Sequence, residues 1–126
     1  NLSKNMALTE SSFYNCIITG ARQNNIVVAT PLSDYYTGSF VGNFMRTDSL
    51  PEVFAHNNVY ATDSDSVVFR NIYYKLNEYR YYDYRLDSLS AARGVGDSVV
   101  AISYPYDRLG QRRKSRPDAG CYEYVQ

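Results

Sequence analysis

Ser12-Phe-Tyr-Asn-Cys-Ile17 recurs in outline 27 residues later as Ser39-Phe-Val-Gly-Asn-Phe44, and after 27 more as Ser66-Val-Val-Phe-Arg-Asn71. A related spacing of 28 residues separates the asparagines that begin Asn15-Cys-Ile, Asn43-Phe-Met and Asn71-Ile-Tyr. A period of this length, made of short apolar runs and polar turns, predicts coils that stack with equivalent residues in register. Asn suits the turns because it tolerates left-handed backbone and its amide can hydrogen-bond the Asn of the next coil.

The rest of the chain also favours strands. β-branched and aromatic residues form short runs separated by polar turn residues. Only Leu2 to Ser12 has a weak helical pattern, and it could equally be a loop. Alternation predicts that Tyr82, Tyr84 and Leu86 face the core, with Tyr81, Asp83, Arg85 and Asp87 exposed. Asp97 to Ser103 is a further predicted strand, which Pro105 interrupts. An ordinary β-sandwich with chance spacing is the alternative, and it would show antiparallel pairing and no Asn ladder.

Four elements near the C-terminus carry a family resemblance. They are Tyr84-Arg-Leu86, Ser90-Ala-Ala-Arg-Gly-Val-Gly96, Asp107-Arg-Leu-Gly-Gln-Arg-Arg113 and Pro117-Asp-Ala-Gly-Cys-Tyr-Glu-Tyr124. Their order and spacing resemble the end of bacterial right-handed parallel β-helix surface proteins of pectate-lyase-like architecture, which finish in a Pro-Asp-Ile-Gly-Ala-Tyr-Glu-Tyr motif. The resemblance implies an all-β right-handed parallel β-helix, a solenoid of three to four coils with a C-terminal cap.

The chain of 126 residues fits a single domain. We expect β-helix coils over residues 12–86 and a C-terminal coil and cap over residues 87–126. The resemblance also implies the C-terminal end of something longer, whose first coil would leave strand edges unpaired. We expect residues 1–11 or self-association to cover that coil.

The charged residues near the C-terminus have a structural interpretation. Asp107 and Arg113 either bind a ligand or pair to hold a loop across the last coil, and burial together with the resemblance favours the second role. The predicted structural cap comprises Asp107, Gly110, Arg113, Pro117, Asp118, Gly120 and Tyr122.

Composition excludes several classes of protein. Thirteen basic residues balance thirteen acidic ones, which argues against nucleic-acid binding. No apolar run is long enough to span a membrane. The polar start contains no signal peptide. Because the first residue is not Met, we expect a processed chain or a fragment, and the resemblance implies a protein that is secreted or at the bacterial cell surface. Cys16 and Cys121 either form one disulfide or remain free thiols, and their apolar surroundings favour free thiols.

Exposed tyrosines are the most plausible functional feature, since the chain has 14 Tyr and no Trp. Flat aromatic rings can stack on sugars, and arginines can clamp an acidic sugar. The ligand-binding candidates are Tyr35, Tyr36, Tyr79, Tyr81, Arg80 and Arg85, and strand packing or a solvated face is the alternative for each.

Few residues point to catalysis or to a metal. Asp48, Asp63 and Asp65 can supply oxygen ligands for calcium, although they fit turn positions better. His56 is the single His, so neither a zinc site nor a nucleophile–His–acid set can be assembled. We therefore expect no cofactor, no metal and no catalytic residue.

These features favour a non-catalytic structural or carbohydrate-binding portion of an exported β-helix protein, with a polysaccharide as its partner. The alternative is a fragment of a polysaccharide lyase or glycoside hydrolase whose active site is mostly upstream.

Overall fold

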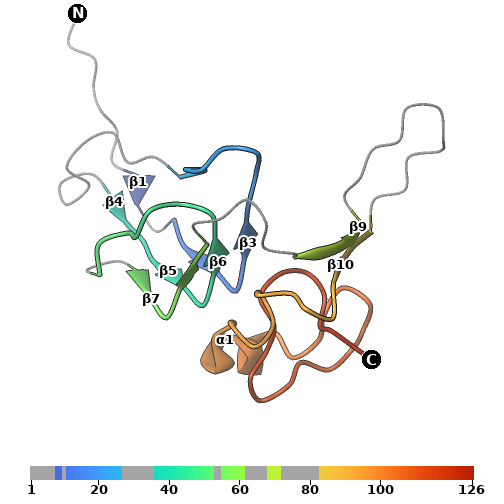
Figure 1. The fold of residues 1–126 in the computed structure, drawn as a ribbon. Coiled ribbons are helices and arrows are strands. Elements are labelled where there is room, and N and C mark those ends of the chain that lie inside the picture. The colour runs from blue at the N-terminus through green and yellow to red at the C-terminus, as the bar shows by residue number, and fades with distance from the viewer. Residues whose placement is uncertain (1–7, 10, 27–35, 53–54, 62–67, 72–82) are drawn as a thin grey trace, which may run out of the picture.

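The computed structural model of the chain describes residues 8–9, 11–26, 36–52, 55–61, 68–71 and 83–126. Within these ranges lie ten short strands and one short helix (Figure 1). The strands are β1 (Leu8–Thr9), β2 (Phe13–Tyr14), β3 (Ile17–Ile18), β4 (Tyr36–Thr37), β5 (Phe40–Val41), β6 (Phe44–Met45), β7 (Ala55–His56), β8 (Val59–Tyr60), β9 (Phe69–Asn71) and β10 (Asp83–Leu86), and the helix is α1 (Ser98–Ser103). The prediction of a mainly β protein is confirmed for this part of the chain. Leu8–Thr9 is a strand, where the sequence had suggested a weak helix or a loop.

Eight of these strands pair in parallel. One sheet has the order β2-β5-β7, a second has the order β3-β6-β8, and β1 pairs with β4. We call residues 13–18, 40–45 and 55–60 rungs 1, 2 and 3. Phe13 is aligned with Phe40 and Phe40 with Ala55, so the rungs are 27 and then 15 residues apart. The spacing of 27 is thus confirmed between rungs 1 and 2, and rung 3 follows sooner than predicted.

A two-residue turn divides each rung into its two strands. The first turn residue has positive φ in every rung, at 51° for Asn15, 67° for Gly42 and 55° for Asn57. Asn and Gly adopt this left-handed conformation at low cost. Gly42 is also required by space, because a Cβ there would lie 2.5 Å from the Asn15 side chain and from the Asp97 nitrogen.

The second turn residues, which are Cys16, Asn43 and Asn58, are joined in a ladder. An asparagine ladder was predicted, but with other residues. Asn58 Oδ1 accepts hydrogen bonds of 2.9 Å from both the backbone and the side-chain nitrogen of Asn43. Asn43 Oδ1 in turn accepts the Cys16 backbone N–H at 2.7 Å. The predicted alignment of Asn15, Asn43 and Asn71 is therefore wrong: Asn15 is one position early, and Asn71 lies in β9, opposite Asp83 of β10.

The strands β9 and β10 pair antiparallel, with a register shift between Asp83 and Leu86. Such an irregularity breaks the alternation of side chains along a strand. Leu86 is buried as predicted, but Tyr84 is 54% exposed and Asp83 only 9%. The predicted orientation of these two residues is therefore wrong.

Residues 98–103 form α1 instead of the predicted strand. Asp97 has extended backbone and its carboxylate accepts the N–H groups of Val99 and Val100, at 2.9 and 3.1 Å. This N-cap satisfies backbone donors that a helix start leaves free. Val99 and Ile102 have branched side chains that favour strands, but both are exposed. Burial therefore adds nothing here to that strand preference.

Two apolar clusters hold the described residues together. Phe40, Met45 and Ala55 form one cluster between the rungs. The adjacent residue Phe44 belongs to the other, with Val68, Leu86, Ala92 and Ala119. Phe44 and Met45 point to opposite faces of the sheet, as successive strand residues do. Residues 87–126, which we call the C-terminal unit, therefore pack on the outer face of β3-β6-β8, beside the rungs (Figure 1).

Candidate functional site

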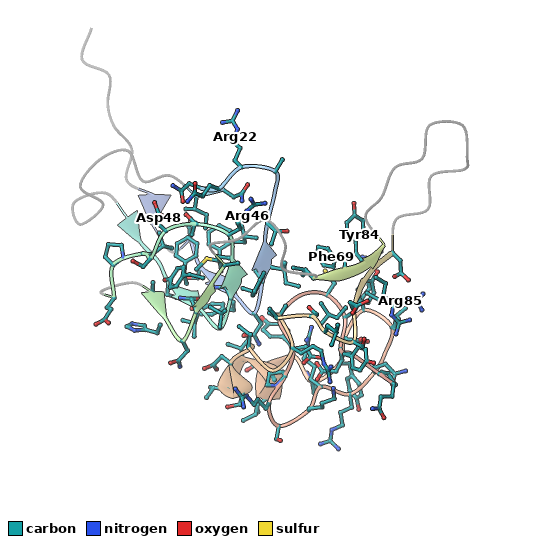
Figure 2. The ribbon with its side chains drawn as sticks, viewed as in Figure 1. Arg22, Arg46, Asp48, Phe69, Tyr84 and Arg85 are labelled. Carbon is teal, nitrogen blue, oxygen red and sulfur yellow. The ribbon has the colours of Figure 1, made fainter. Side chains whose placement is uncertain are left out.

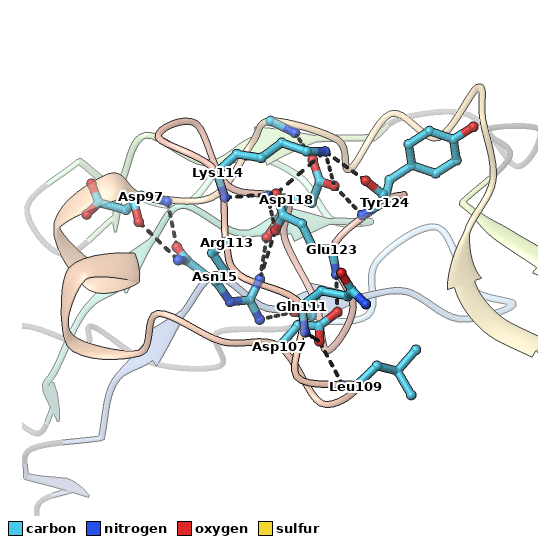
Figure 3. A network of polar contacts seen from close by, with 12 residues as sticks. Asn15, Asp97, Asp107, Leu109, Gln111, Arg113, Lys114, Asp118, Glu123 and Tyr124 are labelled. Carbon is cyan, nitrogen blue, oxygen red and sulfur yellow. Dashed lines mark hydrogen bonds and ion pairs between the residues drawn. The ribbon is translucent and has the colours of Figure 1, made fainter. Parts of the chain in front are cut away.

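The charged residues of the C-terminal unit form a buried network around three carboxylates (Figure 3). Asp107, Asp118 and Glu123 are 8%, 2% and 6% exposed. Asp107 accepts the backbone N–H groups of Leu109, Gln111 and Glu123 at 2.7–2.8 Å. These bonds close the turn at Gly110, where φ is +77°.

Asp118 and Glu123 are satisfied in the same way. Asp118 accepts the N–H groups of Gly94 and Tyr124, both at 2.7 Å. Glu123 accepts those of Asp118 and Lys114 at 3.2 and 3.3 Å. Carboxylates whose oxygens already accept several backbone N–H groups order loops, and few of their lone pairs are left for a ligand.

Arg113 completes the network without contacting Asp107. Its guanidinium donates to the carbonyl oxygens of Asp118 and Gly120, at 3.1 and 2.9 Å, and lies 3.5 Å from Glu123 Oε2. In the C-terminal unit, which the structure describes throughout, Asp107 and Arg113 are thus joined through Glu123. The expected direct pairing is replaced by this link. Glu123 was missed as a cap residue, although it stands within the terminal motif that carries the resemblance.

The other cap candidates also have structural surroundings. Pro117 is buried, and its carbonyl accepts the Gly96 N–H at 2.9 Å. Gly120 has a φ of +94°, and a Cβ there would lie 2.7 Å from Ile17 Cδ1. Tyr122 is half-buried and lines a cavity described below.

Most of the predicted ligand-binding residues cannot be placed. Tyr35, Tyr79, Arg80 and Tyr81 lie outside the described residues, and Tyr36 contributes its backbone to β4. Arg85 on β10 is described (Figure 2). Its guanidinium bonds both carboxylate oxygens of Asp83 at 2.6–3.1 Å. The hydrogen bond from Arg85 lowers the pKa of Asp83 from 3.8 to about 2.

Of the three calcium ligands suggested by the sequence, Asp48 alone lies in the described residues. Asp48 accepts the Asn24 side chain at 2.8 Å, while Asp63 and Asp65 lie outside the description. Across the residues the structure describes, no three His, Cys, Asp or Glu side chains gather in a way that could hold a metal ion. No helix there has the length and apolar character to cross a membrane.

A cavity of about 630 Å³ lies where rung 1, the β9–β10 pair and the C-terminal unit meet. Five aromatic side chains from these separate parts of the chain line it: Tyr14, Phe69, Tyr84, Tyr104 and Tyr122. We call it the aromatic cavity. Ser12, Asn15 and Arg113 add polar groups, and Cys16 and Cys121 add thiols. Among the residues that the structure describes, neither an Asp nor a Glu lines it.

Three of the aromatic rings of this cavity are held by specific contacts. Phe69 and Tyr84 lie on neighbouring strands and meet edge to face, with ring centroids 5.4 Å apart (Figure 2). The Tyr14 hydroxyl accepts a hydrogen bond from Ser39 Oγ at 2.9 Å. That bond, with a smaller effect from Ser12, lowers the pKa of Tyr14. Tyr84 and Tyr104 are more than half exposed and face solvent.

Local sequence patterns do not reveal this cavity. Tyr14 and Tyr122 are separated by most of the chain, and only the packing of the C-terminal unit beside rung 1 brings them together. The abundance of tyrosine was the one available signal. In the comparisons with known proteins, no protein-family model matches the chain, and no curated protein matches it.

Proposed function

We propose that this chain is the C-terminal part of a right-handed parallel β-helix in an exported bacterial surface protein. Three parallel rungs in register, a left-handed residue at each turn and the Asn43–Asn58 ladder support a solenoid over a sandwich. The resemblance of the C-terminal elements supports the family. An experimental structure tests this directly, because a left-handed coil or antiparallel rungs would contradict it.

The function we propose is non-catalytic carbohydrate binding in the aromatic cavity. The observation that carries this proposal is the convergence of five aromatic side chains on one open space of about 630 Å³. Ligand sites of this size are lined mainly by apolar and aromatic groups, with a few polar groups that set orientation. Aromatic rings suit the C–H faces of pyranoses, and Ser12 and Asn15 supply hydrogen-bonding groups at the wall.

The cavity favours a binder over a lyase or hydrolase. Cleavage of a polysaccharide requires a positioned acid or base, and glycoside hydrolases use a pair of carboxylates. No described residue of the cavity lining carries a carboxylate, and the three carboxylates buried in the C-terminal unit already accept backbone hydrogen bonds. The charge of Arg113 is balanced by Glu123, which favours a neutral sugar over an acidic one.

Binding of soluble neutral polysaccharides, measured by calorimetry after a glycan-panel screen, tests the proposal. Tyr104→Ala and Tyr84→Ala each remove an exposed ring of the cavity and should weaken binding about 5- to 30-fold, the equivalent of roughly 1–2 kcal/mol.

Tyr106→Ala is the matched control, because Tyr106 is 62% exposed, close in sequence to Tyr104 and not part of the cavity lining. It should bind like the wild type. If no glycan on the panel binds, or if all three variants bind equally well, the carbohydrate proposal fails and the structural role is left.

A further inference from the structure

Cys16 and Cys121 lie close together although most of the chain separates them. Both line the aromatic cavity. The residues that precede them are in direct backbone contact, since the Gly120 N–H donates to the Asn15 carbonyl at 2.7 Å. Each cysteine is thus one residue away from the same hydrogen bond. Both are free thiols in the structure.

The segment around Cys16 is held against the C-terminal unit at several points. The Asn15 side chain exchanges two hydrogen bonds with the backbone of Asp97, at 2.6 and 3.1 Å. On the other side of Cys16, Ile17 packs so closely on Gly120 that a Cβ there would lie 2.7 Å from Ile17 Cδ1. These contacts hold the backbone segments that carry Cys16 and Cys121 against each other, which is the first requirement for a disulfide.

We propose that Cys16 and Cys121 form an oxidisable thiol pair, a modification site at which a disulfide joins rung 1 to the C-terminal unit. The proposal is independent of carbohydrate binding, because it depends on the contacts of Asn15 and Ile17 with Asp97 and Gly120 and not on a sugar.

The two thiols differ in reactivity. Cys121 is exposed, whereas Cys16 is half-buried and its Sγ donates to the Tyr14 carbonyl at 3.2 Å. Burial raises the pKa of Cys16, with a further contribution from the charge of Cys121. Because the thiolate is the attacking species, Cys121 reacts first with an external oxidant.

A small-molecule disulfide such as oxidised glutathione is the oxidant. The Cys121 thiolate attacks one glutathione sulfur, which forms a mixed disulfide and releases one glutathione thiolate. The Cys16 thiol then loses its proton and attacks the Cys121 sulfur, which releases the second glutathione thiolate. The two protons lost by the cysteines are taken up by the two glutathione thiolates, so two cysteines are oxidised as one glutathione disulfide is reduced.

The test uses the folded, reduced chain incubated with oxidised glutathione, followed by intact-mass measurement and peptide mapping. We expect a monomer that has lost two hydrogens, with the Cys16 and Cys121 peptides cross-linked. Its Tm should rise by several degrees or more relative to the reduced chain, because the bond closes a loop of about 100 residues and restricts the unfolded state.

Two single variants identify the order of the steps. Cys16→Ser should stop at the mixed disulfide on Cys121, and Cys121→Ser should react at least several-fold more slowly at Cys16. Neither variant should show the rise in Tm. Stable glutathione adducts on both cysteines of the wild type, disulfide-linked dimers, or a cross-link that forms only in denaturant would each overturn the proposal. None of these readouts involves a glycan, so they do not depend on the proposed function.

Discussion

Asn43 shows how one buried polar side chain can connect three segments of this protein. It is fully buried, and its amide bonds the Cys16 N–H, the Phe13 carbonyl and the Asn58 side chain at 2.7–2.9 Å. All three rungs therefore meet at this residue. An apolar replacement would take these partners from two partly buried backbone groups of rung 1, which costs more than the lost bonds themselves.

Asn43→Ala should accordingly lower the free energy of unfolding by about 2–4 kcal/mol, because the Cys16 N–H and the Phe13 carbonyl lose their Asn43 partner. Urea denaturation followed by circular dichroism measures this. Asn24→Ala is the control, because Asn24 bonds the exposed Asp48 and its loss should cost under about 1 kcal/mol. Equal losses in the two variants would show that the ladder is not a special source of stability.

Asp83 and Arg85 give the protein a predictable response to acid. The folded-state pKa of Asp83 is about 2, below its usual 3.8, so the unfolded chain binds this proton more readily. Stability from the pair is therefore fully present above about pH 4 and is lost as the pH falls towards 2.

The free energy of unfolding of the wild type should fall between pH 5 and pH 2, in part because Asp83 becomes protonated. Arg85→Ala should flatten the profile in that range, since without the guanidinium the pKa of Asp83 returns towards its usual value. An unchanged pH profile in Arg85→Ala would refute the linkage.

At the scale of elements, α1 demonstrates that a cap can override the preference of the residues that follow it. Val99, Val100 and Ile102 favour strands, yet the Asp97 carboxylate binds two N–H groups of the first turn. Ala101 is the one buried residue of the helix, so packing contributes little to the choice.

Asp97→Ala should destabilise the protein by about 1 kcal/mol, whereas Asp97→Asn, which retains a capping oxygen, should be close to the wild type. The Asp97 backbone still bonds Asn15 in both variants, so the difference isolates the cap. The midpoint of urea denaturation measures it, and a loss as large in Asp97→Asn as in Asp97→Ala would disagree with the capping role.

For the molecule as a whole, the C-terminal unit lies along the side of the rungs. Its Ala92 and Ala119 pack with Phe44 of rung 2, and its Gly120 bonds Asn15 of rung 1. In the described residues, the rung 1 strands β2 and β3 each have a sheet neighbour on one side only. Rung 1 is therefore an open edge of both sheets. Phe13 and Tyr14 there are 41% and 45% exposed.

Such an edge is a template for pairing with another chain, so we expect self-association at rung 1. Sedimentation velocity should show a dimer that grows with concentration, and Phe13→Lys should shift it towards the monomer by placing a charge at the edge. Val99→Lys on the exposed side of α1 is the control and should dimerise normally. A wild type that stays monomeric at all concentrations would rule this out.

The sequence by itself determined the character of the strands and turns. It indicated a strand-rich chain, the spacing of 27 between rungs 1 and 2, and the use of Asn at turns. It also singled out Asp107 and Asp118, which are buried, and Arg113, which is half-buried. All three are bonded within the C-terminal unit. These features are local, because turn conformation and strand alternation depend on residues a few positions apart.

Only the tertiary structure decided which segments meet. Rung 3 follows rung 2 by 15 residues, so Asn58 joins the ladder where Asn71 was expected. Asn15 meets Asp97 across 82 residues of chain, and with that contact the aromatic cavity and the thiol pair are assembled. Such contacts follow from the burial of Phe44, Ala92 and Ala119 in one cluster. The packing energy of that cluster depends on segments far apart in the sequence, so no sequence period predicts it.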